Sequence, residues 1–206
     1  QLFTHAEAPK LDVNDHADGD LAVFIRLGSD YKNNYYEYEV PLKLTPHGEY
    51  NYNNTEHQKI VWPAENMLNF RLQVLTDLKL ERNRQKRSGE NGVSFQTIYL
   101  GRDPDNESNT IRVKGNPSLS EVKTIMIGVR NVRNKLKSGE VWVNELRLTD
   151  FNEEGGWAAN ANLNVALSDL GTVNVGGRIE TAGFGALDQS LNERRMEDFK
   201  QYNVAT

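Results

Sequence analysis

Residues 157–183 alternate apolar and polar side chains through two consecutive segments, and this pattern is the strongest constraint in the chain. In the first segment one face carries Trp157, Ala159, Ala161, Leu163, Val165 and Leu167. After the turn Asp169-Leu170-Gly171, the same face continues with Val173, Val175, Gly177 and Ile179. Side chains alternate between faces along a strand, so the pattern predicts a β-hairpin with one apolar and one polar face. Because two strands are not stable alone in water, we expect further strands beyond this chain.

The composition excludes several classes of site. The 206 residues contain no cysteine, which rules out disulfides, thiolate metal sites and cysteine nucleophiles. The net charge of −5 gives no general case for a nucleic-acid partner, so none is predicted. The first residues do not read as a signal peptide, and no stretch has the length of a membrane-spanning helix.

The order of predicted elements indicates a mainly β chain in three parts. Residues 1–20 are polar, are interrupted by Pro9 and Gly19, and form an entry segment. Residues 21–152 contain many short β-rich runs, which predict an antiparallel, jelly-roll-like β-sandwich. Residues 153–206 hold the hairpin, which resembles the strands of outer-membrane barrels, followed by a short amphipathic helix within residues 190–202.

One helix is predicted inside the sandwich, at about residues 63–86. Pro63 suits the first turn of a helix, where a missing N–H costs nothing. Apolar residues then recur at helical spacing at Met67, Phe70, Val74 and Leu78. Ser88 and Gly89 end the pattern, so the sequence places a single amphipathic helix in this region.

A cluster of aromatic residues is the best candidate for a binding surface. Tyr35, Tyr36 and Tyr38 lie on one predicted strand, and Trp142 lies on another. Such side chains stack on sugar rings or anchor a protein partner when they are exposed together. Packing in a half-buried sheet explains the tyrosines as well, and it is the favoured interpretation because aromatic residues are common in strands.

An oxygen-rich loop is the candidate metal site. Its side chains are those of Asp103, Asp105, Asn106 and Glu107, and calcium prefers several oxygen ligands. The spacing does not match the calcium loop of helix–loop–helix proteins, so ordinary turn chemistry is favoured and no cofactor beyond this possible calcium ion is predicted.

No constellation for catalysis is visible in the sequence. The histidines lack metal-ligand spacing, and nothing pairs a nucleophile with a base. Glycoside hydrolysis needs two carboxylates across a cleft at about 5–9.5 Å, and the sequence does not pair any of Glu37, Glu39, Glu140 and Glu145. We therefore expect a protein that is not an enzyme.

Three stretches carry a resemblance to a known family. They are residues 61–66 (VWPAEN), residues 139–151 (GEVWVNELRLTDF) and residues 155–159 (GGWAA), of which the second is the most specific. With these motifs the chain resembles the SprA/Sov family, the very large outer-membrane proteins of Bacteroidota used in gliding motility and type IX protein secretion. Members of that family form a giant β-barrel that lets folded cargo cross the outer membrane.

The resemblance implies a structural segment of a translocon that shapes the conduit and offers docking surface to cargo or accessory proteins. The implied partners are the remainder of its own barrel, secreted proteins, accessory subunits and, through residues 157–183, outer-membrane lipid. The implied location is the bacterial outer membrane or cell surface. Because barrels have short periplasmic turns, the three-residue turn would face the periplasm and the sandwich would be extracellular. The alternative is a carbohydrate-binding β-sandwich module of a cell-surface protein.

Overall fold

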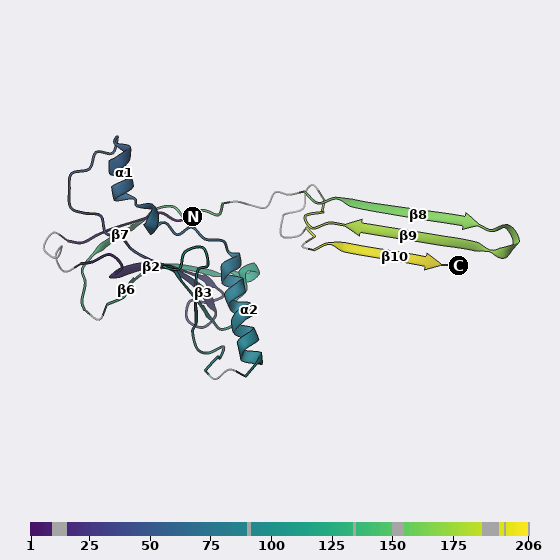
Figure 1. The fold of residues 1–206 in the computed structure, drawn as a ribbon, viewed down its shortest axis with the longest axis horizontal. Helices are drawn as coiled ribbons and strands as arrows, with labels where there is room; N and C mark the ends of the chain where they lie inside the picture. The colour runs from purple at the N-terminus through teal and green to yellow at the C-terminus, as the bar shows by residue number, and fades with distance from the viewer. Residues whose placement is uncertain are drawn as a thin grey trace. The chain divides into compact units, whose positions relative to one another are not determined.

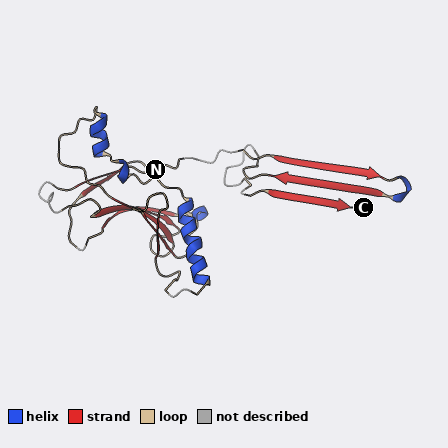
Figure 2. Ribbon diagram, in the orientation of Figure 1, coloured by secondary structure: helices blue, strands red, loops and turns tan. Residues whose placement is uncertain are grey.

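A computed structural model describes residues 1–9, 16–89, 92–133, 135–149, 155–186, 194–195 and 197–205. The chain forms two compact units, Gln1–Thr149 (unit 1) and Asp150–Thr206 (unit 2), each of which is described by itself. Strands dominate both units, and the longer helices belong to unit 1 (Figure 2). The predicted boundary at residues 152 and 153 falls within residues 150–154, which lie outside the described part of the chain.

Unit 1 is organised around an antiparallel five-stranded sheet. The spatial order of its strands is β4 (Tyr99–Arg102), β5 (Thr110–Lys114), β3 (Tyr35–Pro41), β2 (Leu21–Gly28) and β6 (Thr124–Asn131). A separate antiparallel ribbon joins β1 (Thr4–Glu7) to β7 (Glu140–Val143). The mainly β, antiparallel fold predicted from the sequence is therefore confirmed.

The core of unit 1 lies on one face of the five-stranded sheet. Alternate residues of the central strands, such as Val23 and Tyr38, point to this face and are buried. Helix α2 (Gln73–Arg87) packs against it through Val74 and Leu75, and it contacts β3, β4 and β5 (Figure 1). The layer that covers the sheet is thus a helix together with the β1–β7 ribbon, in a sandwich-like arrangement.

The first residues belong to this core, which corrects the prediction of an entry segment over residues 1–20. Leu2 and Ala6 are buried, and β1 pairs with β7, which lies near the other end of unit 1 in the sequence. Leu2 also exchanges two backbone hydrogen bonds with Leu68, of 3.0 and 2.9 Å. The polar composition of the segment gives no sign of this role, because only partners far away in the sequence make it a strand.

The predicted helix at about 63–86 begins ten residues too early. Two short helices, α1 (Thr55–Val61) and η2 (Ala64–Asn66), precede α2, which starts at Gln73. Asn66 is buried, and its amide group binds the backbone N–H of Lys43 at 2.7 Å and the backbone carbonyl of Lys43 at 2.8 Å. These bonds and the Leu68 pairing hold the chain extended, so tertiary contacts override the helical spacing.

Unit 2 is a three-stranded antiparallel sheet in the order β10–β9–β8. Its strands are β8 (Ala158–Ala166), β9 (Thr172–Glu180) and β10 (Phe199–Ala205), and the turn η4 (Ser168–Leu170) links the first two. The predicted hairpin is confirmed. The amphipathic helix predicted within residues 190–202 is wrong where it can be compared, because residues 199–202 belong to β10; residues 190–193 and 196 lie outside the described part. In neither unit is any described helix both long and apolar enough to cross a membrane.

Candidate functional site: a two-faced sheet and an ion cluster

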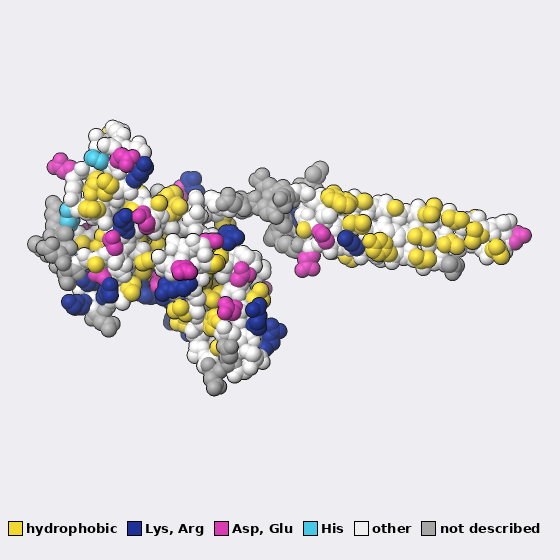
Figure 3. Space-filling view, in the orientation of Figure 1, with side chains coloured by type: hydrophobic (Ala, Val, Ile, Leu, Met, Phe, Trp, Pro, Cys, Tyr) yellow, Lys and Arg dark blue, Asp and Glu magenta, His cyan; other side chains and the backbone are white. Residues whose placement is uncertain are grey.

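The sheet of unit 2 separates its side chains into two chemically different faces. On the apolar face, Leu163 lies opposite Val175, which lies opposite Val204. The rows beside them are Ala161, Gly177 and Tyr202, then Ala159, Ile179 and Lys200. In the space-filling view, hydrophobic side chains follow the length of β8, β9 and β10 (Figure 3). The third strand therefore extends the apolar face that the hairpin sequence predicts, except at Lys200.

The opposite face is lined by side-chain amides. Its rows are Asn164 with Asn174, Asn162 with Gly176 and Asn203, and Asn160 with Arg178 and Gln201. The asparagines on either side of Gly176 close over it, because a Cβ there would overlap the side-chain oxygen of Asn203 and lie 2.8 Å from that of Asn162. Gly176 thus lets two amide groups from neighbouring strands approach each other across β9.

Both faces of this sheet are open to solvent among the residues described. Every residue of β8 is exposed, and Val204 in β10 and Leu163 in β8 expose 70% and 60% of their surface. Glu180 is an exception at the end of β9, where it is buried and ion-paired with Arg178 and with Arg195. A large exposed apolar face on a sheet is typical of a surface that contacts a membrane or another molecule.

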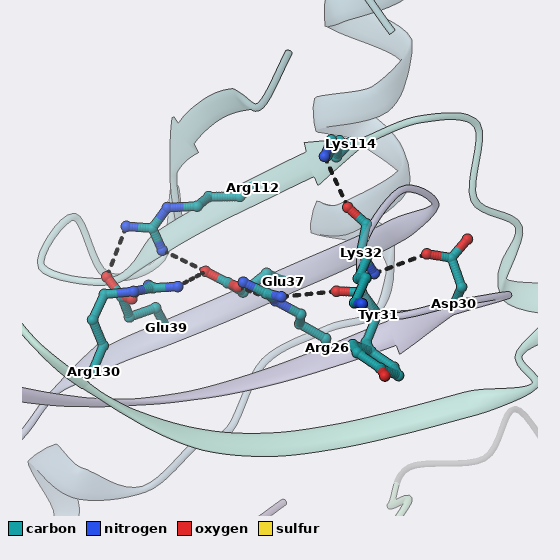
Figure 4. A network of polar contacts seen from close by, with 9 residues as sticks. All are labelled: Arg26, Asp30, Tyr31, Lys32, Glu37, Glu39, Arg112, Lys114 and Arg130. Carbon is teal, nitrogen blue, oxygen red and sulfur yellow. Dashed lines mark hydrogen bonds and ion pairs between the residues drawn. The ribbon is translucent and has the colours of Figure 1, made fainter. Parts of the chain in front are cut away.

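Unit 1 carries a cluster of five charged side chains on the face of the sheet opposite the core (Figure 4). Glu37 has no exposed surface, and it accepts hydrogen bonds from Arg26 at 2.5 Å, Arg112 at 2.8 Å and Arg130 at 2.9 Å. Glu39 pairs with the same Arg112 at 2.9 Å and with Arg130. The arginines come from β2, β5 and β6, so this cluster ties three strands to β3.

The electrostatics of the cluster keep Glu37 ionised. Burial by itself raises the pKa of Glu37, but hydrogen bonds from Arg26 and Arg130 and the charges of both outweigh it, so the pKa lies below its ordinary value. The ring of Tyr35 lies under the guanidinium of Arg26, 4.3 Å from its central carbon. The arginine stems and the ring of Tyr35 cover this face of the sheet in place of a second layer.

The sequence contains a signal for this cluster, although the predictions from sequence did not include it. Glu37 and Glu39 are two residues apart on one strand and so must share a face. The register places Arg26 and Arg112 directly across from Glu37 on the two neighbouring strands. The cluster can be predicted only when it is known which strands are neighbours, and the sequence does not supply the strand order.

The predicted aromatic binding residues are not gathered on one exposed platform. Tyr35, Tyr36 and Tyr38 are all buried, and the ring of Tyr38 stacks on Phe70 at 3.9 Å. The hydroxyl of Tyr36 donates to the carbonyl of Pro117 at 3.0 Å. Trp142, on β7, is 60% exposed, but it belongs to the separate ribbon. The tyrosines thus serve packing, and the arrangement does not favour a carbohydrate-binding module.

The oxygen-rich loop is organised by turn hydrogen bonds. Asp103 is buried, binds the hydroxyl of Tyr38 and accepts from the N–H of Asp105 at 2.9 Å. Asp105 pairs with Arg71 at 2.8 Å, Asn106 caps the N–H of Ser108 at 3.2 Å, and Glu107 is exposed. In the described part of the chain, no three His, Asp or Glu side chains are grouped to hold a metal ion, and calcium binding at this loop stays a prediction.

Three of the glutamates considered for hydrolysis, Glu37, Glu39 and Glu145, are held in ion pairs with arginines. Glu37 and Glu39 are neutralised by the arginines, and Glu145 is exposed and bonded to Arg147 at 2.5 Å. The hydrogen bond from Arg147 and its charge hold the pKa of Glu145 below its ordinary value.

The comparisons with known proteins concern the whole chain. A comparison with curated proteins found no match. Among protein families, the SprA_N family, described as motility related/secretion protein, matches residues 1–206. This confirms the resemblance drawn from residues 61–66, 139–151 and 155–159. The chain therefore belongs to the SprA_N family of motility related/secretion proteins.

Proposed function

We propose that this chain is a non-catalytic structural segment of an outer-membrane protein translocon that serves type IX secretion and gliding motility in Bacteroidota. In this proposal the sheet of unit 2 forms part of the wall of a wide barrel. The sandwich-like unit 1 stands at the extracellular mouth, where it shapes the conduit and offers docking surface to cargo and accessory proteins. The family assignment supports the general role in motility and secretion.

The two faces of the unit 2 sheet are the observation that carries the proposal. A wall between lipid and water needs strands with one apolar and one polar side, which is the pattern of β8, β9 and β10. The apolar face, with Leu163, Val175 and Val204 exposed, would contact the acyl chains. The amide-lined face would contact water, and its few charges would leave it compatible with cargo of either sign.

The strand lengths agree with this assignment. β8 and β9 each contain nine residues. At about 3.3 Å per residue such a strand is about 30 Å long. A tilt of about 40° reduces the span to about 23 Å, close to the apolar band of about 25 Å in outer-membrane barrels. The length of both strands is therefore close to that of one crossing of the hydrocarbon layer.

A pair of neighbouring substitutions in the full-length parent protein tests the proposal. Leu163→Arg places a charge on the apolar face, and Asn162→Arg, one residue earlier, places the same charge on the amide face. Arginine facing lipid near the bilayer centre costs about 2–4 kcal/mol, whereas the water-facing side tolerates it. We expect Leu163→Arg to lower the amount of protein assembled in the outer membrane and to reduce secretion. Equal tolerance of both variants would contradict the lipid contact.

The proposed orientation has its own test, which uses the absence of cysteine from this chain. Tyr52 in unit 1 and Leu170 at the hairpin turn are 82% and 90% exposed, so Tyr52→Cys and Leu170→Cys give accessible thiols. In intact cells, a maleimide that cannot cross the outer membrane should label Tyr52→Cys. It should label Leu170→Cys only after the membrane is opened. The reverse pattern would invert the orientation, and labelling of both in intact cells would show that β8 does not cross the membrane.

A further inference from the structure

The outer edge of β6 is an open strand edge in unit 1. β6 is the last strand in the order β4–β5–β3–β2–β6, and no described strand pairs with its far side. It is eight residues long and contains neither proline nor an assigned bulge. Natural sheets usually protect such edges with proline, short strands or charged side chains, because a free edge recruits another strand.

The register shows which residues carry the free backbone groups. Val132 N–H donates to the carbonyl of Asp20 at 2.9 Å, and in an antiparallel pair the bonded positions repeat every second residue. Even-numbered residues of β6 therefore bond to β2. Ile125, Ile127 and Val129 direct their N–H and C=O groups away from the sheet.

The same three residues expose apolar side chains. Their partners on β2 are Leu27, Ile25 and Val23, so they share the core face of the sheet. Val23 and Ile25 are buried, yet Ile125, Ile127 and Val129 are 55%, 38% and 47% exposed. The cover provided by α2 and the β1–β7 ribbon therefore stops short of β6. An added strand would pair with these backbone groups, and its own side chains would cover part of the exposed apolar surface of these three residues.

The charge around this edge indicates what kind of strand fits. Residues 122–139, between Glu121 and Glu140, contain five basic residues and no acidic residue, although the whole chain carries a net charge of −5. Arg130 is paired with Glu37 and Glu39 on the other face, and Arg133 and Lys137 are paired with Asp20. Lys123 and Lys135 lie beyond the two ends of the strand. A second copy of this edge would bring like charges together, whereas an acidic strand would meet opposite charge.

We propose that the β6 edge binds an extended acidic segment of another protein, which adds to the five-stranded sheet as a sixth strand. Alternate apolar residues of that segment pack beside Ile125, Ile127 and Val129, and acidic residues at its ends meet Lys123 and Lys135. The backbone bonds supply affinity, and the apolar alternation and the acidic ends supply selectivity. The proposal concerns unit 1 alone, so it does not depend on the membrane role proposed for unit 2.

A synthetic peptide tests the proposal with the 206-residue chain. The probe is a twelve-residue peptide of four Val-Thr repeats flanked by two glutamates at each end, N-methylated on one edge so that it cannot pair with itself. Binding is followed by fluorescence anisotropy. We expect saturable binding that weakens severalfold between 50 and 500 mM salt and at least tenfold when lysines replace the glutamates. Equal binding of the lysine peptide, or no binding of the acidic one, would overturn the proposal.

Substitutions of Ile127 separate edge pairing from simple apolar contact. Ile127→Pro removes an outward N–H while leaving the bonds to β2 in place, and it should weaken binding at least tenfold. The control Ile127→Val keeps the N–H and an apolar side chain, so it should change binding less than threefold. If Ile127→Pro prevents folding, Ile127→Lys takes its place. It keeps the backbone N–H and places a charge between Ile125 and Val129, so binding should again weaken at least tenfold. Unchanged binding by folded Ile127→Pro, or by Ile127→Lys where it replaces the proline variant, would refute strand addition.

The other possible occupants give distinct results. Analytical sedimentation of the 206-residue chain would detect a dimer if the edge pairs with a second copy. A dimer in the wild type that Ile127→Pro converts to a monomer would assign the edge to that second copy. In the full-length parent protein, a photo-reactive residue at position 127 would report the neighbour by mass spectrometry. A cross-link to the parent polypeptide itself would replace the proposed partner with an internal strand, and either result would overturn the proposal.

Discussion

Removal of the charge of Glu37 is the sharpest test of what holds unit 1 together. Glu37→Gln keeps the shape of the side chain but leaves Arg26, Arg112 and Arg130 with Glu39 as their only carboxylate in the cluster. Breaking a buried ion pair from one side costs about 3–5 kcal/mol, because the remaining charge is left desolvated. The arginine side chains keep 17–30% of their surface exposed, and water there offsets part of the loss. We therefore expect the lower end, about 3 kcal/mol.

The assay needs a signal from unit 1 alone. Trp62 and Trp142 belong to unit 1 and Trp157 to unit 2, so a Trp157→Phe background restricts tryptophan fluorescence to unit 1. With a urea m-value of about 2 kcal/mol/M, a loss of about 3 kcal/mol lowers the unfolding midpoint by about 1.5 M. The matched control is Glu65→Gln. Its pair with Lys43 is exposed on both sides, and an exposed pair contributes at most about 1 kcal/mol.

The pH dependence gives a second readout of the same cluster. The pKa of Glu37 is lower in the folded state than its ordinary value of 4.5. The stabilisation is therefore complete well above pH 4.5 and is lost as the pH falls through the lower folded value. The difference in unfolding free energy between wild type and Glu37→Gln should be constant near neutral pH and shrink below 4.5. A midpoint shift no larger than that of Glu65→Gln, or a difference independent of pH, would refute the reasoning.

Two further predictions concern buried polar contacts and close backbone packing in unit 1. Tyr38→Phe removes the hydroxyl shared by Asp103 and Asn109, and leaving these buried groups without it should cost about 1–3 kcal/mol of unfolding free energy, measured by urea denaturation. Gly115→Ala should cost more than Gly89→Ala. Both glycines have positive φ, +71° and +80°, so either change strains the backbone by about 1 kcal/mol, but a Cβ at Gly115 also overlaps a backbone carbonyl whereas at Gly89 it meets open space. Equal midpoints for the two alanine variants would show that backbone strain alone sets the cost.

The sequence predicted the strands better than the helices. Strand alternation over residues 157–179 is a local property, and the register of β8 with β9 pairs the residues that the pattern had placed on one face. Helical spacing from Met67 to Leu78 is local as well, yet only its second half became α2. The first half is held extended by Leu2 and Lys43, which lie far away in the chain, and no local pattern contains that information.

The candidate sites were harder to predict than the fold. Tyrosines on a strand are compatible with an exposed platform or with a core, and the choice depends on which face the rest of the chain covers. Helix α2 and Phe70 cover the face of Tyr36 and Tyr38, while Arg26 covers Tyr35. Residues 199–202 of the third strand of unit 2 were assigned to a helix for a related reason, since Phe199–Ala205 joins the sheet only by pairing with β9.

The sequence by itself determined the two-faced character of residues 157–179 and the largely β nature of the chain, because side-chain alternation and β propensity act between near neighbours. It also supplied the motifs of the family. Only the tertiary structure decided that Glu37 is buried among three arginines and that Ile125, Ile127 and Val129 line an open edge. The physical reason is that burial and pairing depend on which strands become neighbours, and that choice is made by contacts distant in the sequence.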